Sequence, residues 1–339
     1  MELYLDSADI NEIKEAFKLG FIDGLTTTPT FMHRHGITDV DATIVELADI
    51  VPVLQIEALG ETAEEIVAEA YRQEKLGLDR TKTVYKIPVS LEGVKACKEL
   101  TKEGFLVNIH LVYTLQQAYM AMQAGATYVC PLVGRLQDQG TDALALVQDC
   151  VNAVNYYGYD TKIMFSSVRN VEHVRNAIDA GVHTITVPFK IMKQLTENHF
   201  TEIGTRQFFE HTRLMTVRVK DIINDKNPTV TATSTVTDCL VKMTSGGFGA
   251  VTVVNDNQEA IGFFTDGDLR RLIETDGSDA INKKMSDLNL NTPLSIDGNE
   301  LLFEAQRVFT EKKVDELVVT SGGKVIGMLD IQDLVKLNS

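Results

Sequence analysis

The chain has few cysteines and no apolar run long enough to span a bilayer. Only four of its 339 residues are cysteine, and they form neither a CxxC pair nor a zinc-type Cys/His spacing: Cys97, Cys130, Cys150 and Cys239. This usage argues against a disulfide framework and a metal site, and it predicts reduced thiols and a cytoplasmic location. The first ten residues lack the basic segment that begins a secretory signal.

Basic residues are outnumbered, and no long basic cluster is present. The sequence has 32 Lys and Arg against 48 Asp and Glu, which gives a formal net charge of -16. Such a surface repels the phosphates of nucleic acids and anionic membranes, so neither is expected as a partner. Small anionic molecules remain candidates, because a few well-placed arginines can bind a phosphate within a diffuse negative field.

The first part of the chain, residues 1–213, alternates short β-rich runs with segments of helical periodicity. Strands are predicted at residues 3–5, 25–28, 53–57, 84–87, 106–110, 128–131, 163–167 and 184–187. Eight strand–helix units in about 200 residues predict an α/β fold of the compact (β/α)8 TIM barrel type. An open doubly wound sheet is the alternative, but no glycine-rich dinucleotide fingerprint follows the first strand. Residues 208–220 are expected to carry the last barrel helix and a linker.

The second part, residues 214–339, is an internal repeat. We predict a first repeat at 214–276 and a second at 280–339, each with a strand, a helix, two strands and a closing helix. The matched landmarks are GFFTDGD at residues 262–268 and GMLDIQD at residues 327–333. A repeat of this size indicates paired modules that bury their faces against each other.

Polar residues lie at or just after the ends of the predicted barrel strands, where a parallel barrel carries its chemistry. They are Asp6, Thr26, Thr28, Glu57, Lys86, His110, Arg135, Ser167 and Arg169. Chance also favours polar residues there, because strand ends meet loops.

Lys86 is the most informative of these residues. It lies in VYKIPV, residues 84–89, a run that should be buried on both faces in a parallel barrel. Burial favours a neutral amine, which attacks a ketone to form a carbinolamine and then an iminium. The iminium accepts electrons and allows a neighbouring C–C bond to break. The alternative is a strand-end lysine whose ammonium reaches solvent.

Asp6 and Glu57 are candidates for general acid and base catalysis, one acting on a substrate hydroxyl and the other through a water. The alternatives are ion pairing with Lys86, and for Asp6 a capping role at the helix that follows. His110 is either a packed core histidine or a proton-transfer residue.

Arg135 and Arg169 suit a substrate phosphate, with Ser167 as a further donor. The alternative is that both arginines form ordinary surface salt bridges. Thr26 and Thr28 are candidate contacts to the substrate.

The chain from residue 1 to about residue 209 resembles the short transaldolases and fructose-6-phosphate aldolases. The matching segments are MELYLD (1–6), GLTTTP (24–29), YKIPV (85–89), GATYV (125–129), PLVGR (131–135), SVRN (167–170) and TVPFK (186–190). The resemblance implies a Schiff base between Lys86 and a ketose donor, without a separate cofactor, and a ring-like homo-oligomer. It also implies Asp6 as the acid/base at the breaking bond and a catalytic water held by Glu57. Arg135, Ser167 and Arg169 are implied contacts to the phosphate and the donor hydroxyls.

Three positions depart from the family pattern, all on the donor side of the implied pocket. Thr28 stands where Asn is usual, His110 where Thr is usual, and Leu132 where an aromatic is expected. Thr28 offers no amide donor, and His110 is larger than a hydroxyl and moves protons differently. These changes argue against ordinary fructose-6-phosphate or sedoheptulose-7-phosphate as substrate. Glu57 favours the transaldolase pattern, because the aldolases typically have Gln there.

The repeats resemble a CBS domain pair, and residues 262–271 are similar to the pair attached to arabinose-5-phosphate isomerases. The resemblance implies a nucleotide-type effector, with Thr265 at its phosphate and Asp268 at its ribose hydroxyls. In the second repeat Asp333 remains, but Asp330 replaces the hydroxyl residue and repels phosphate. The alternative is a block that serves only dimerisation.

Three functions remain open from the sequence. The first, which we predict, is a regulated transaldolase-type transferase that moves a three-carbon ketol unit between sugar phosphates. The second is a class I aldolase, a lyase of the fructose-6-phosphate aldolase type that releases the donor unit. The third is a non-catalytic sensor of sugar phosphates and nucleotides. For the first, the expected partners are sugar phosphates, a nucleotide or nucleotide-sugar effector, and further copies of the chain.

Overall fold

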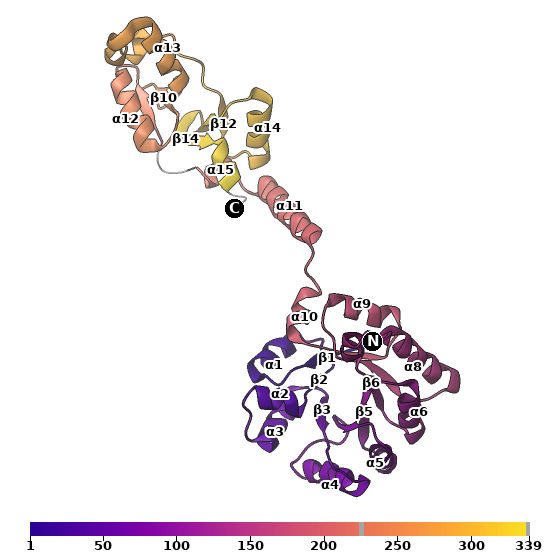
Figure 1. Ribbon diagram of the computed structural model, residues 1–339. Coiled ribbons are helices and arrows are strands. Elements are labelled where there is room, and N and C mark those ends of the chain that lie inside the picture. Colours follow the sequence, from indigo (N-terminus) through magenta and orange to yellow (C-terminus); the bar gives the residue numbers. More distant parts are fainter. Residues whose placement is uncertain (224–226, 337–339) are drawn as a thin grey trace. The chain divides into compact units, whose positions relative to one another are not determined.

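The computed structural model describes residues 1–223 and 227–336 and divides the chain into two compact units (Figure 1). The first unit is Met1–Glu197 and the second is Asn198–Ser339. Helix α11 (His199–Thr216) belongs to the second unit, where it packs on α14 (Leu302–Lys312), although residues up to 213 were predicted to belong to the barrel. The predicted domain boundary at residue 213 stays a prediction.

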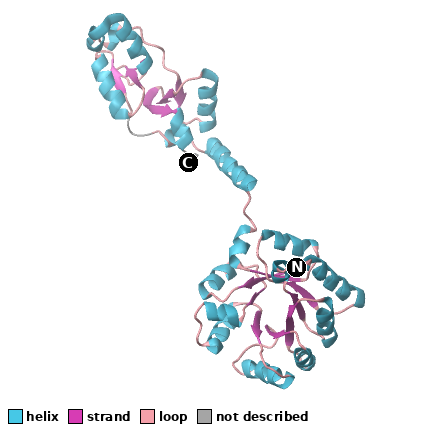
Figure 2. Cartoon of the chain, viewed as in Figure 1, coloured by secondary structure: helices cyan, strands magenta, loops and turns pink. Residues whose placement is uncertain are grey.

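The first unit is a closed barrel of eight parallel strands in sequence order, which confirms the predicted fold class. Figure 2 shows these strands as a ring surrounded by helices. The strands are β1 (Glu2–Asp6), β2 (Gly24–Thr26), β3 (Leu54–Glu57), β4 (Thr83–Pro88), β5 (Leu106–Val112), β6 (Tyr128–Pro131), β7 (Lys162–Phe165) and β8 (Thr184–Val187).

Helices follow the strands, and side-chain caps begin several of them. Asp9, Thr62, Ser90, Thr114 and Asn170 each accept a hydrogen bond from a backbone N–H in the first turn of their helix. The helices of this unit are α1 (Ile10–Phe17), α2 (Pro29–Arg34), α3 (Val40–Ile50), α4 (Ala63–Glu74), α5 (Leu91–Lys102), α6 (Leu115–Ala124), α7 (Val133–Asp138), α8 (Ala143–Tyr157), α9 (Val171–Asp179) and α10 (Phe189–Gln194). With six residues each, α2, α7 and α10 are too short to show helical periodicity in the sequence.

Strand alternation decides which side chains point into the ring. In β4, Tyr85 and Ile87 pack in the large core between strands and helices, whereas Val84 packs in a separate cluster with Tyr4 and Tyr128. Because successive side chains alternate between the two faces of a strand, Lys86 shares the inner face with Val84.

The second unit contains the two predicted repeats, each built as strand, helix, strand, strand, helix. Their sheets have the orders β11-β10-β9 and β12-β13-β14. The first repeat contains β9 (Thr229–Thr231), α12 (Val236–Gly246), β10 (Ala250–Val254), β11 (Ala260–Thr265) and α13 (Asp266–Asp276), and the second contains β12 (Ser295–Asp297), α14, β13 (Glu316–Ser321), β14 (Lys324–Asp330) and α15 (Ile331–Lys336). Three short 3-10 helices lie at Val219–Asp221, Gly277–Asn282 and Met285–Asp287.

The repeats pack together through small apolar clusters. One joins Phe248 and Ala250 of the first repeat to Met328 of the second, and another joins Val254 to Val318. This packing fits the expectation that the repeats bury their faces against each other. Across the described residues of both units, no helix combines the length and apolarity that a membrane crossing requires.

Candidate active site in the barrel

Sheet register brings the acid and the lysine together at one end of the barrel. Glu57 ends β3 and is the direct register partner of Lys86 in β4. Asp6 ends β1 and is the register partner of Thr26, which ends β2. All four side chains therefore lie near the C-terminal ends of adjacent strands, where barrel enzymes carry their chemistry.

The amine of Lys86 lies inside the protein. Its side chain is 6% exposed, so the alternative of a lysine that reaches solvent is wrong. Nζ donates to the carbonyl oxygen of Thr27 at 2.8 Å and to Glu57 Oε1 at 2.9 Å. Glu57 is therefore within direct proton-transfer distance of this amine.

Glu57 bridges Lys86 and His110. The second carboxylate oxygen, Oε2, lies 2.9 Å from His110 Nε2, and the Glu57 and His110 side chains are 7% and 10% exposed. Burial opposes the charge on Glu57, but Lys86 and His110 outweigh it, so the pKa of Glu57 lies below its usual value. Burial also lowers the pKa of His110, although Glu57 opposes this effect.

Asp6 is held in a different environment from Glu57. Thr26 Oγ1 lies 3.0 Å from Asp6 Oδ1 and also contacts the hydroxyl of Thr186. Burial raises the pKa of Asp6 above its usual value, against the opposing effects of Lys86 and Thr26. The capping alternative is wrong, because Asp9 caps α1. Two carboxyl groups with opposite pKa shifts beside one amine can serve as separate acid and base groups.

The predicted phosphate contacts follow β6 and β7, which are neighbouring strands of the barrel. A Cβ placed on Gly134 would overlap the carbonyl oxygen of Ser167 and lie 2.8 Å from Arg169 Nε. Ser167 has a left-handed φ of 59° that turns the chain at this point. Arg135 Nη1 donates to the Tyr113 hydroxyl at 3.4 Å, and both arginines are exposed.

Arg169 also forms a surface salt bridge, in which its Nη2 lies 2.7 Å from Asp138 Oδ2. This contact is the alternative role that the sequence left open for the arginines. The two side chains are 51% and 58% exposed, so this pair contributes little to stability and can open for an anion.

Two of the three residues that depart from the family pattern, Thr28 and Leu132, have structural roles in the barrel. Thr28 is not in a strand as predicted, because Pro29 cannot donate to the sheet and suits the first turn of α2. Thr28 caps α2, and its Oγ1 accepts from Phe31 N at 3.3 Å. Leu132 is 8% exposed and forms an isolated bridge with Ser166 at the β6 and β7 ends.

Sequence reasoning missed three contributors to this site. Gly134 is required by the close approach of the Ser167 and Arg169 segment, and its only sequence signal was its place in PLVGR. Thr186 at the end of β8 completes the hydroxyl contact to Thr26. Thr27 acts through its carbonyl oxygen, which has no sequence signal because every residue has one.

In the first CBS-like repeat, Thr265 and Asp268 contact each other at the start of α13. Asp268 Oδ2 accepts from Thr265 N and Oγ1 at 2.9 and 2.7 Å, which forms a capping box. Asp268 Oδ1 contacts Arg271 at 2.5 Å. Burial opposes the charge on Asp268, but Thr265 and Arg271 outweigh it and lower the pKa of Asp268. A cavity of about 230 Å³ adjoins these residues, lined by Phe263, Phe264, Asp268, Arg271, Leu272, Thr275, Leu288, Asn289 and Leu290.

The second repeat lacks the hydroxyl at the matching place. Asp333 Oδ2 accepts from Asp330 N at 3.2 Å, and Asp333 Oδ1 accepts from Lys336 Nζ at 3.2 Å. Asp330 places a carboxylate where the first repeat has the hydroxyl of Thr265, and this substitution disfavours phosphate at that position.

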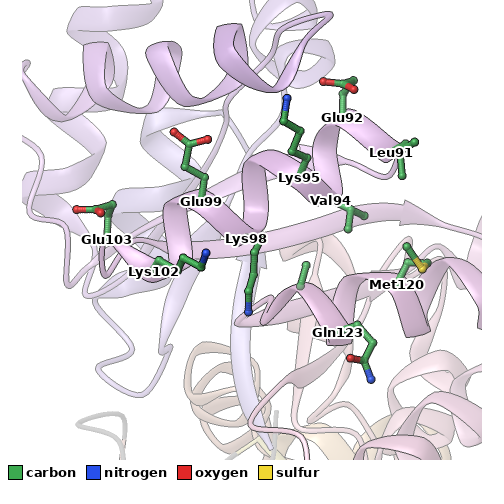
Figure 3. Close-up of a pocket in the computed structure, with 11 residues that line it drawn as sticks. Leu91, Glu92, Val94, Lys95, Lys98, Glu99, Lys102, Glu103, Met120 and Gln123 are labelled. Atoms are coloured by element: carbon green, nitrogen blue, oxygen red, sulfur yellow. The ribbon is translucent and has the colours of Figure 1, made fainter.

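A groove of about 700 Å³ lies away from this chemistry, on the outer wall between α5 and α6 (Figure 3). Its lining includes Lys95, Lys98, Met120 and Gln123, and none of the predicted site residues. Its charged side chains belong to a solvated helix face, so it is not the candidate active site.

The closed barrel and its strand-end cluster of amine, carboxylates and rim arginines define an enzyme of the (β/α)8 class. The chain belongs to the transaldolase/fructose-6-phosphate aldolase family, whose pattern it matches over residues 3–234. Residues 219–275 and 285–339 match the CBS domain. The chain is therefore a transaldolase-type enzyme with a CBS pair.

The relatives of the barrel are probable transaldolases. Those of Thermoanaerobacter sp. (strain X514) and Streptococcus agalactiae serotype V are each 39% identical to this chain, cover 63% and 62% of it, and are themselves covered over 97% and 96% of their length. Among solved structures, the CBS domain of a CBS domain-containing membrane protein from Sphaerobacter thermophilus is 17% identical. That match covers 41% of this chain and 98% of the other, with a TM-score of 0.35.

Proposed function

We propose that this protein forms a Schiff base through Lys86 and transfers a three-carbon ketol unit between sugar phosphates. The observation that carries this proposal is the buried Lys86 amine, 2.9 Å from Glu57 Oε1 at the strand-end mouth of the barrel. A buried amine with a proton acceptor within reach suits iminium formation, because the neutral amine is the nucleophile.

Asp6 is the proposed acid/base group for breaking the C–C bond. Once the donor is held as an iminium, Asp6 removes the proton of the hydroxyl on the leaving carbon. The C–C electron pair moves to the iminium nitrogen, an aldehyde leaves, and an enamine stays on Lys86. The reverse steps on an acceptor aldehyde return the proton from Asp6 to the new hydroxyl. The raised pKa of Asp6 suits a carboxyl group that must hold this proton.

The rim residues are the proposed substrate contacts. Arg135 and Arg169 offer guanidinium donors to a phosphate, and Ser167 adds a hydroxyl. Thr26 and Thr28 are proposed contacts to the donor hydroxyls. Asp138 has to release Arg169 before that guanidinium can bind a phosphate in a bidentate manner.

The test is borohydride reduction of the wild-type chain in the presence of a panel of ketose phosphates, followed by peptide mass mapping. We expect the reduced donor fragment on Lys86. Mass on another lysine, or on none, contradicts the proposal. Product analysis without an acceptor distinguishes the second function, because only a lyase accumulates free three-carbon ketone. A sensor without activity traps no substrate and forms no product.

We also propose that the CBS pair binds a nucleotide-type effector at its first repeat. Thr265, Asp268 and the adjoining cavity support this proposal, and the exposed guanidinium of Arg271 adds a cationic donor for a phosphate. Asp330 disfavours the same ligand at Asp333 in the second repeat. The kinship with the arabinose-5-phosphate isomerase pair, a homo-oligomeric state and a cytoplasmic location stay predictions.

Melting curves with adenine, cytidine and sugar nucleotides test the effector site. A ligand that binds only the folded state raises the melting temperature by several degrees at saturation. We expect Asp268→Ala to lose this ligand-induced rise, whereas Asp333→Ala, the matched change in the second repeat, should keep it. Each rise is measured against the same variant without ligand, because Asp268→Ala also removes a helix cap. An equal rise in Asp268→Ala and the wild type contradicts the assignment.

A further inference from the structure

We propose that His110 is a positioning residue that acts through Glu57, and that the two side chains together hold the proton that Lys86 must lose while its Schiff base forms. This inference rests on the proposed Schiff base at Lys86. It gives a chemical role to a residue at which the chain departs from the family pattern.

The first observation is an unusual buried contact. Glu57 Oε2 and His110 Nε2 lie 2.9 Å apart, and both side chains are almost fully buried. Neither atom has another hydrogen-bond partner among the described residues. Buried polar atoms are normally satisfied, and an exception calls for an explanation. A separation of 2.9 Å is within the distance at which two such atoms share a proton.

The second observation is the backbone that directs His110. Strand β5 carries a bulge, because Ile109 pairs with Val129 but the next pair joins Val112 to Pro131. Leu111, inside the bulge, has a φ of 55°, a strained value for a residue with a branched side chain. The carbonyl oxygen of His110, the residue before Leu111, accepts from Val89 N at 3.0 Å. This bond fixes the backbone of His110 against the residue that follows β4. Bulges of this kind re-aim a side chain beside active sites.

The third observation concerns the charges that face the imidazole. Glu57 from β3 favours its protonated form, whereas Lys86 from β4 and Arg135 from α7 disfavour it. The charge of Lys86 also disfavours a proton on Glu57. When Lys86 becomes a neutral amine, both members of the pair therefore gain proton affinity. When the iminium restores a positive charge at the same nitrogen, the pair loses that affinity again.

The protons of Schiff base formation move in step with these changes in charge at the Lys86 nitrogen. The Lys86 ammonium passes one proton to the Glu57–His110 pair, and the free amine adds to the ketone carbon. The carbonyl π bond breaks, and its oxygen takes a second proton from the nitrogen to give the carbinolamine. The pair then returns its proton to that hydroxyl, the C–O bond breaks, and water leaves. Lysine ammonium and ketone become iminium and water, with no other reactant.

His110→Gln tests the relay, because the amide keeps a hydrogen-bonding group but cannot take the proton. We expect borohydride trapping at Lys86 to slow by about 100-fold, with a pH profile that loses the dependence on the imidazole. His110→Thr, whose hydroxyl also cannot take the proton near neutral pH, should slow trapping by a similar factor. His183→Gln, a histidine at the opposite end of the barrel that accepts from Ile163 N, is the matched control and should change neither quantity.

A measurement that leaves His110 in place guards against variants that fold poorly. In Lys86→Met the ring of His110 should titrate at a higher pH than in the wild type, because the ammonium beside it is gone. Imidazole NMR on the full chain, with His110→Thr to assign the signal among the seven histidines, reports this shift. An unchanged titration, or wild-type trapping in His110→Gln at every pH, overturns the relay. A wild type that is not trapped at Lys86 overturns the proposed function instead.

Discussion

Lys86→Met is expected to lose covalent trapping and to reduce turnover by about 10⁴-fold or more, because no other group in the site can form the iminium. Methionine keeps most of the side-chain volume, so the barrel should still fold. Mass spectrometry after borohydride treatment checks the adduct, and steady-state kinetics with an accepted ketose phosphate check the turnover.

The same change has a destabilising effect whose size depends on pH. In the wild type, the lowered pKa of Glu57 contributes stability that is present above its unfolded value and is lost as pH falls through the folded one. Removing the ammonium leaves a buried carboxylate unpaired, which costs about 3–5 kcal/mol at neutral pH. Melting temperatures across pH should therefore show Lys86→Met least stable at neutral pH and closer to the wild type in acid.

Lys95→Met is the matched control for Lys86→Met. Lys95 pairs with Glu64 at 2.7 Å on the outer wall of the barrel, where both side chains are more than half exposed. This change should leave trapping and turnover at wild-type values. An adduct that persists in Lys86→Met, or equal losses in both variants, means that Lys86 does not carry the chemistry.

Asp6→Asn should separate the two halves of the reaction. Lys86 and Glu57 are untouched, so we expect trapping of a ketose donor to continue. Cleavage of the C–C bond should fall by about 10²–10⁴-fold, because an amide cannot take the hydroxyl proton. Single-turnover release of the aldehyde measures the cleavage step, and borohydride trapping measures the first step in the same sample.

Stability gives an independent check on Asp6. Because its pKa is raised in the folded state, stability linked to Asp6 is present below the unfolded pKa and is lost as pH rises through the folded one. Asp6→Asn should therefore gain thermal stability at neutral pH and gain less in acid. Asp9→Asn, which keeps a capping residue on α1, should change neither stability nor cleavage. Loss of trapping in Asp6→Asn would place Asp6 at the Schiff base step instead.

The barrel class could be read from local patterns. Eight short apolar runs alternate with helical segments, and this order leaves few ways to bury both faces of the strands. The tandem repeat was likewise visible in two copies of one motif. Lys86 stood out because a lysine in VYKIPV is unusual for a strand that a parallel barrel buries on both sides.

Contacts between strands depend on how the ring closes, and no local pattern encodes them. Glu57 contacts both Lys86 and His110 because of the register of β3, β4 and β5 and because of the bulge in β5. No pattern in the sequence predicted that bulge. Gly134 acquired its importance only when the Ser167 segment came within reach of it. The assignment of α11 to the second unit has the same origin, because it packs on α14, whose residues lie about 100 positions further along the chain.

Side-chain type and spacing thus settled which chemical groups are present and on which elements they lie, since these depend on short-range preferences. The distances between those groups, the contact between His110 and Glu57 and the opposite pKa shifts of Asp6 and Glu57 arise from closure of the barrel. Closure removes water from one end of the ring and fixes charges against each other, and both effects exist only in the folded chain.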